Sequence, residues 1–299
     1  VYLWRACYPF DGKISSDGKA YFEKAAYWAT QVKNSNKHHL NPDVYTMWKA
    51  MASDTYDTEY NESIWEAEFI GTRDDGSYTA GRIGNVIGNI QKGTANPGNG
   101  YAYGFYAPTL ILWDLFDEKD KRRDLSIAPY QINAKEEKVE WTAKQIVQRS
   151  CGKFRREWES AATKHKNYTP ENYPLLRYAD VLLMLAEAEN EANGPTQKVY
   201  DAVNKVRVRS GQPELPAGLT KDQMRERIRN EWRVEFVFEG HRYFQLKRWK
   251  LMDKLVNGAS DPALPTYVKV FKPAFYYFPL PQSEIDKAGG VLVQDPNYK

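Results

Sequence analysis

The chain has 299 residues and a net charge of only +3 at pH 7, with its basic residues spread along the sequence. It therefore lacks the concentrated positive charge that is typical of nucleic-acid-binding proteins. Its longest purely apolar run, residues 181–186, is far shorter than the roughly 20 residues that span a bilayer, and two cysteines, Cys7 and Cys151, are too few for a disulfide framework.

The first 32 residues predict helical structure. Residues 1–10 are interpreted as the remnant of a helix, and residues 17–32 form a second helical pattern. The apolar residues of that second pattern recur at helical spacing: Phe22, Ala25, Ala26, Ala29 and Val32. Small alanines on a packed face let a neighbouring helix approach closely, as in helical hairpins of the tetratricopeptide type.

The middle of the chain is poor in helical signals. Residues 62–69 alternate roughly and predict a strand or a short buried segment. Gly, Asn, Asp, Ser and Thr dominate residues 71–104, and a loop of this length inside a compact domain is usually functional. A short helix is predicted over residues 109–115, and short strands and loops over residues 130–172.

A second helical hairpin is predicted after this region. Residues 175–193 carry an apolar stripe that ends at Gly194, and residues 197–209 provide the returning helix. Thr220 is placed to cap the next helix, with Gln223 completing a capping box.

A last long helix is predicted over residues 241–256, with Gly258 in place to close it. Together the patterns predict a mainly α-helical protein, in which tetratricopeptide-like hairpins are interrupted by a large loop-rich insertion. We expect this insertion, residues 52–172, to carry the ligand site. Because the chain opens abruptly without a methionine, we expect residues 1–299 to form a single domain that lacks its N-terminal part.

Five ordered motifs point to a known family. They are NGYAYGFYAPT (residues 99–109), WDLFDEKDKRRDL (113–125), YPLLRYADVLLMLAEA (173–188), VNKVRVRSG (203–211) and NEWRVEFVFEGHRYFQLKRW (230–249), the last followed by FPLPQSEI (278–285). In order and spacing they resemble the SusD/RagB family of outer-membrane nutrient-binding lipoproteins. The resemblance covers roughly residues 100–299.

The resemblance implies a SusD-like α/α superhelix and a non-catalytic function. By that resemblance, the protein binds oligosaccharide or polysaccharide on the surface of a Gram-negative outer membrane. It then passes the glycan to a SusC-like TonB-dependent transporter, on which it acts as a lid. Its membrane association is expected only through an N-terminal lipid that is absent from this chain, since neither Cys7 nor Cys151 can be the lipid-bearing cysteine. A peptide ligand, as in some relatives, stays open as the alternative.

Three glutamates, Glu231, Glu235 and Glu239, repeat every four residues and fall on one helical face. A carboxylate pair for glycoside hydrolysis is one interpretation. We favour a structural ion network that includes Arg242, because carboxylates among large aromatic residues need partners in order to be buried.

Functions other than binding stay open. A glycoside hydrolase is left open with these candidate carboxylates: Glu66, Glu68, Asp74 and Asp75. A pure scaffold of helical repeats is also open. His241 lacks the companion residues of a metal motif and is interpreted as structural. No metal site or cofactor is predicted, although calcium held by distant loops stays open.

Aromatic residues make up 14% of the chain, and those on polar, glycine-rich loops are the favoured ligand contacts. Flat rings complement the C–H face of a sugar, while neighbouring polar groups bind its hydroxyls. The predicted ligand-binding residues are Tyr78, Tyr101, Tyr103, Arg73, Arg82 and Asn99. A packing role for Tyr101, Tyr103 and Tyr106 is the open alternative, and Trp65 and Trp113 are expected in the core.

Overall fold

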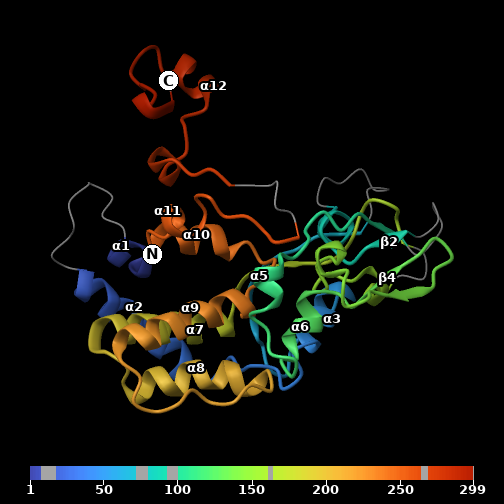
Figure 1. The fold of residues 1–299 in the computed structure, drawn as a ribbon, viewed down its shortest axis with the longest axis horizontal. Helices are drawn as coiled ribbons and strands as arrows, with labels where there is room; N and C mark the ends of the chain where they lie inside the picture. Colours follow the sequence, from blue (N-terminus) through green and yellow to red (C-terminus); the bar gives the residue numbers. More distant parts are fainter. Residues whose placement is uncertain (8–17, 72–79, 93–99, 161–163, 264–268, 299) are drawn as a thin grey trace. The chain divides into compact units, whose positions relative to one another are not determined.

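The computed structural model describes residues 1–7, 18–71, 80–92, 100–160, 164–263 and 269–298 (Figure 1). The chain forms two compact units, Val1–His241 and Arg242–Lys299. Helices are the main elements of the described residues, which confirms the predicted fold class.

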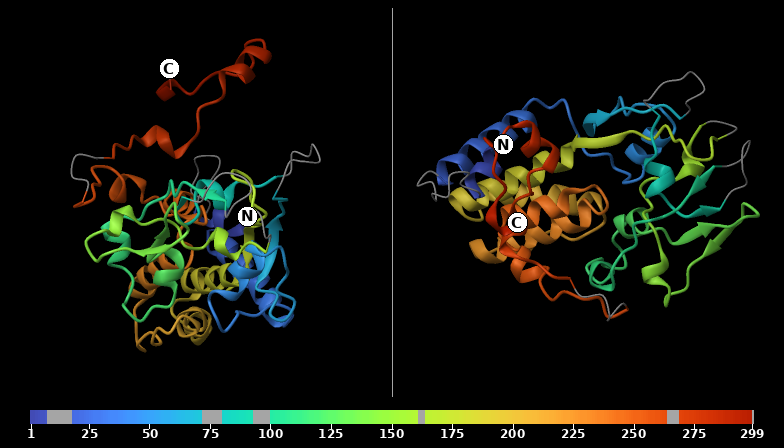
Figure 2. Two further views of the ribbon diagram at one scale, coloured as in Figure 1. Left: turned by 90° about the vertical axis from the view of Figure 1, so that its right-hand side faces the viewer. Right: turned by 90° about the horizontal axis from the view of Figure 1, so that it is seen from above.

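The helical layer of the first unit is organised around α7 (Tyr178–Asn193). Against it pack α2 (Gly18–Asn34), α8 (Gln197–Arg209) and α9 (Lys221–Glu235), which run side by side with it (Figure 1, Figure 2). A short helix, α1 (Tyr2–Cys7), packs on α2. Because neighbours surround α7, nearly all of its first thirteen residues are buried, polar ones included.

Local sequence explains how these helices pack and end. Ala26 and Ala29 are the buried residues of α2, so small side chains stand where this helix meets α7, as predicted. The predicted capping box is confirmed at α9, where the Thr220 hydroxyl accepts from the Gln223 backbone N–H and the Gln223 side chain accepts from the Thr220 backbone N–H. The helix predicted over residues 197–209 is also confirmed.

The helix predicted from residue 175 begins three residues later. Residues Tyr173–Arg177 instead form a strand, β6, which pairs in antiparallel fashion with β1 (Ser63–Ala67). The backbone N–H of Tyr178 donates to the Glu62 carbonyl at 2.7 Å, so the ribbon leads directly into α7. A strand partner more than 100 residues away decided the boundary, and no local pattern indicates it.

A four-stranded sheet forms the other part of the first unit. Its order is β3 (Tyr101–Ala102), β2 (Gln91–Lys92), β4 (Tyr130–Ile132) and β5 (Lys138–Glu140). The first unit also contains short helical segments: α3 (Thr46–Ala52), α4 (Ile83–Val86), α5 (Leu110–Trp113), α6 (Arg122–Ser126), η1 (Ile146–Gln148) and η2 (Arg156–Trp158).

The second unit consists of short helices. They are α10 (His241–Arg248, whose first residue closes the first unit), α11 (Met252–Leu255), η3 (Pro273–Tyr276), α12 (Gln282–Lys287) and η4 (Pro296–Tyr298). The single helix predicted over residues 241–256 is therefore wrong. The chain breaks after Arg248, and Lys250 adopts a positive φ of 53°, which a continuous right-handed helix cannot contain.

Candidate ligand-binding surface

Three aromatic side chains line up at the end of β3. Tyr101, Tyr103 and Phe105 occupy alternate positions of the chain, and neighbouring rings are in contact. The Tyr101 and Tyr103 ring centroids are 4.8 Å apart, and Tyr103 stacks on Phe105 at 5.0 Å with an interplanar angle of 11°. Tyr103 is 39% exposed and Phe105 67% exposed. We call these three side chains the aromatic ladder.

The short helix α4 holds the main chain of the ladder residues through hydrogen bonds. The Asn85 side-chain amide donates to the Tyr101 carbonyl at 2.8 Å, and the Tyr103 N–H donates to the Asn85 carbonyl at 2.8 Å. The Phe105 N–H donates to the Val86 carbonyl at 3.0 Å. Arg82 precedes the helix and donates to the Asn85 side-chain oxygen at 3.1 Å, so its guanidinium binds the same amide group that holds the Tyr101 carbonyl.

A fully buried arginine lies beneath the ladder. The guanidinium of Arg156 donates to four main-chain carbonyls, those of Tyr101, His165, Lys166 and Tyr168, at 2.7–3.0 Å. It also binds the Glu159 carboxylate at 2.5 and 3.2 Å. Gly100 has a φ of +80°, and a Cβ at that position would overlap the guanidinium. Glycine is therefore required here both by the backbone conformation and by the close approach of Arg156.

The structure brings together three of the predicted ligand-binding residues, Arg82, Tyr101 and Tyr103. The other three, Tyr78, Arg73 and Asn99, lie outside the described residues. Sequence reasoning missed Phe105, the most exposed ring of the ladder. Its position two residues beyond Tyr103 was the available signal, because alternate residues of an extended chain face the same way.

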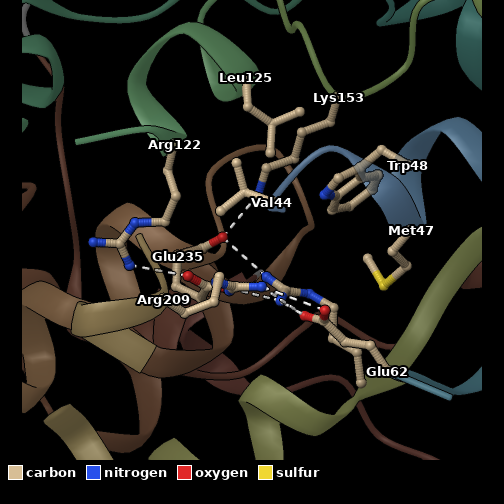
Figure 3. A pocket seen from close by; sticks show the side chains of 10 residues that line it. Val44, Met47, Trp48, Glu62, Arg122, Leu125, Lys153, Arg209 and Glu235 are labelled. Atoms are coloured by element: carbon tan, nitrogen blue, oxygen red, sulfur yellow. Dashed lines mark hydrogen bonds and ion pairs between the residues drawn. The ribbon is translucent and has the colours of Figure 1, made fainter. Parts of the chain in front are cut away.

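The glutamates of residues 230–249 form a buried ion network, as the sequence predicts. Glu235 is its centre: it accepts from Arg177 and Arg209 at 2.6 Å each and from Arg122 at 2.9 Å (Figure 3). Glu231 also pairs with Arg122, at 2.5 Å, and Glu239 pairs with Arg177, at 2.8 Å, and with Lys153. Arg242, the cation predicted for this network, is the first residue of the second unit, and its part in the network stays a prediction.

The network has a structural function. Burial by itself raises the pKa of Glu235, but Arg209, Arg177 and Arg122 overcome that effect and hold its pKa well below the usual value. The cavity between these side chains and Trp48 has a volume of about 10 Å³, which admits about one water molecule and no sugar (Figure 3).

Other sequence candidates have local roles. The Glu66 carboxylate accepts from the Asn172 amide at 2.9 Å, and Glu68 accepts from the Tyr56 hydroxyl at 2.8 Å. Asp74 and Asp75 lie outside the described residues. His241 packs against Phe236 and Trp232, with its Nδ1 3.7 Å from Asp180.

The prediction that Trp65 belongs to the core is wrong. The two-stranded ribbon of β1 and β6 leaves this side chain 63% exposed. Trp113 is partly buried against a hydrophobic cluster that contains Phe116 and Ile127, and the guanidiniums of Arg123 and Arg149 both lie within 5 Å of its ring centre.

Two further observations concern metals and membranes. Among the described residues, no three His, Cys, Asp or Glu side chains are grouped so that they could hold a metal ion. Within the same part of the chain, no helix has the length and apolar character needed to cross a membrane.

Comparison with known proteins gives a consistent family signal. The model of the SusD family matches residues 61–298. SusD-like protein P2 of Formosa agariphila is 25% identical over 293 residues, which cover 93% of this chain and 56% of that protein.

Solved structures that share the fold include two from Bacteroides species. A SusD homolog from Bacteroides thetaiotaomicron is 30% identical, with a TM-score of 0.78 over 99% of this chain and 61% of that one. Surface glycan-binding protein A from Bacteroides uniformis is 25% identical, with a TM-score of 0.72 over 100% of this chain and 60% of that one. The chain therefore spans about three fifths of the length of these relatives.

Proposed function

The chain belongs to the SusD family, and from that membership we propose that it binds an oligosaccharide or polysaccharide at the cell surface without changing it chemically. The observation that carries the proposal is the aromatic ladder, in which Tyr103 and Phe105 present stacked, exposed rings. The relative from Bacteroides uniformis, named for glycan binding, supports the same class of ligand.

The chemistry of the ladder suits a sugar. The apolar C–H face of a pyranose ring buries area against a flat aromatic side chain and gains weak C–H···π attraction. The Arg82 guanidinium, which is joined to the main chain of Tyr101 through Asn85, has donors for the hydroxyl groups at the edge of the ring. Contacts of this kind provide moderate affinity, which suits a protein that must release its ligand.

Family membership also supports a place in nutrient uptake. We propose that the protein is anchored by a lipid to the outside of the outer membrane of a Gram-negative bacterium, and that it delivers the glycan to a SusC-like TonB-dependent transporter. A gene for such a transporter next to this one, and co-purification of the two proteins from membranes, are the expected results. Isolation of the full-length protein without any transporter would contradict this partner.

The ladder yields a direct mutational prediction. Tyr103→Ala and Phe105→Ala are each expected to weaken glycan binding by about tenfold, because each removes one stacked ring and the apolar area that it buries against the sugar. Isothermal titration calorimetry with laminarin, xylan and amylopectin gives the affinities. Circular dichroism checks that both variants remain folded.

Tyr27→Ala is the matched control. Tyr27 is an aromatic side chain of α2 with 55% exposure, and its removal is expected to leave glycan affinity unchanged. Unchanged affinity in both ladder variants would contradict the site. Binding of peptides with no glycan binding would favour the peptide alternative, and release of sugar products that a carboxylate-to-amide change abolishes would favour a hydrolase.

A further inference from the structure

A second buried carboxyl group lies under the ladder. Glu171 is 1% exposed, and among the residues that the structure describes neither of its carboxylate oxygens makes a hydrogen bond of normal geometry, although the Thr169 hydroxyl and its own backbone N–H lie close by. The carboxylate presses against the main chain of α4, since a Cβ added at Gly84 would overlap it. A buried carboxylate without a donor is strongly disfavoured in its ionised form.

The nearest charged groups explain how Glu171 is accommodated. Burial raises the pKa of Glu171 most, and the charge of the Glu159 carboxylate raises it further. The nearby Thr169 hydroxyl and the charge of Arg156 lower it. For Glu159, burial raises the pKa, whereas Arg156 and then Lys164 lower it. Arg156, however, already binds both oxygens of the Glu159 carboxylate and donates its other N–H groups to main-chain carbonyls. Two buried carboxyl groups thus share one guanidinium.

One proton on this pair of carboxyl groups removes the excess negative charge. A protonated Glu171 has an O–H that can donate to the Glu159 carboxylate, which removes the second negative charge and satisfies one Glu171 oxygen. The electrostatics agree with the geometry. Burial, followed by the charge of Glu159, raises the pKa of Glu171 to about 7, and burial also raises the pKa of Glu159.

The carboxyl pair touches both supports of the ladder. Arg156 and Asn85 each donate to the same two carbonyls, those of Tyr101 and Lys166. Glu159 holds Arg156 from below, and Glu171 presses on Gly84, the residue before Asn85. A second negative charge in the pair therefore disturbs Arg156 and Asn85, the two side chains that position Tyr101.

We propose that one proton, held between Glu159 and Glu171, keeps the aromatic ladder in its binding arrangement, and that loss of this proton to solvent loosens the ladder and lowers glycan affinity. The statement about affinity rests on the proposed function. Arg156, Glu159 and Glu171 are thus positioning residues, which act on the ligand through the ladder.

The direction of the pH effect follows from the sign of the shift. The folded state holds this proton more tightly than the unfolded chain, in which a glutamate has its ordinary pKa near 4.5. The stabilisation is therefore complete below about pH 4.5 and is lost as the pH rises through about 7. The ladder should be better ordered at pH 5.5 than at pH 8.5.

Amide hydrogen exchange of the ladder tests the proposal. The Tyr103 and Phe105 N–H groups, which bond to α4, are followed at pH 5.5 and 8.5 and corrected for intrinsic exchange. In the wild type, protection should fall by about tenfold at the higher pH. Glu171→Gln has the same shape, stays neutral and keeps a donor, so its protection should change less than about twofold. Glu118→Gln, at an exposed carboxylate, should behave like the wild type.

Wild-type protection that is independent of pH, or a Glu171→Gln variant with the same pH dependence as the wild type, would overturn the proposal. A second measurement compares the wild type with Glu171→Gln: infrared difference spectra of the wild type should show a protonated carboxyl band that ionises between pH 5.5 and 8.5 and is missing from the variant. Asp180, whose pKa is also raised to about 7 by burial, gives its own band in both proteins. Absence of that band overturns the proposal as well.

Laminarin titrations at the two pH values separate this inference from the proposed function. Affinity that falls with pH in the wild type but not in Glu171→Gln supports both. Affinity that is equal at the two pH values overturns the proton linkage and leaves glycan binding intact. A complete lack of glycan binding counts against the proposed function, and the amide measurement then decides the linkage.

Discussion

Glu235→Gln is expected to destabilise the first unit by about 3–5 kcal/mol, the effect of removing one partner from a buried ion pair. The substitution preserves shape, so it isolates charge from packing. It leaves the guanidiniums of Arg122, Arg177 and Arg209, each at most 7% exposed, without the carboxylate that contacts all three. Urea denaturation followed by far-ultraviolet circular dichroism measures the loss.

Glu226→Gln is the control on the same helix. Glu226 is 65% exposed and pairs with Arg229 one turn away, so its loss should cost no more than about 0.5 kcal/mol. A similar small effect at Glu235 would mean that the network contributes little beyond its packing.

The pH dependence of folding stability should also differ between Glu235→Gln and Glu226→Gln. Arginine neighbours lower the pKa of Glu235 in the folded state against the opposing effect of burial. Its contribution is therefore present above the unfolded value near 4.5 and is lost as the pH falls below it. Glu235→Gln should consequently lose less stability on acidification than the wild type, whereas Glu226→Gln should follow the wild type.

Arg156→Met is expected to cost at least about 4 kcal/mol and to abolish glycan binding. It removes the donor to the His165 and Tyr168 carbonyls and one of the two donors to the Tyr101 and Lys166 carbonyls, which keep their bonds from Asn85. Each buried polar group left without a partner costs about 1–3 kcal/mol. It also leaves the buried Glu159 carboxylate without its cation. Thermal unfolding and laminarin titration below the melting range measure the two effects separately.

Arg156→Lys provides the graded comparison at the same position. A lysine keeps the charge for Glu159 but has fewer donors than a guanidinium and no planar fork. We expect intermediate stability and glycan binding that is at least tenfold weaker. Wild-type affinity in Arg156→Met would show that the ladder does not depend on its support, or that the glycan binds elsewhere.

Much of the helical architecture could be predicted from local patterns. The spacing of apolar residues located α2, α7 and α8, and the capping box at Thr220 located the start of α9. These signals are local because a helix satisfies its backbone hydrogen bonds within one segment. Family motifs added the SusD-like fold, which no periodicity could specify.

The candidate surface was only partly predictable. The polar, glycine-rich setting of Tyr101 and Tyr103 marked them as ligand contacts, and the structure brings their rings into contact with each other and stacks Tyr103 on Phe105. No local pattern in the sequence marks Arg156 or Glu171. Their importance comes from burial beneath the ladder, and burial depends on how distant segments pack.

The sequence alone indicated the family, most of the helices, and three glutamates that need cationic partners in order to be buried. Only the tertiary structure decided which cations they find, because Arg122, Arg177 and Arg209 come from three separate segments. The tertiary structure likewise exposed Trp65, whose surroundings are set by a strand pairing with β6. Spacing along the chain records local geometry, whereas burial and charge pairing arise only when distant segments close around a common core.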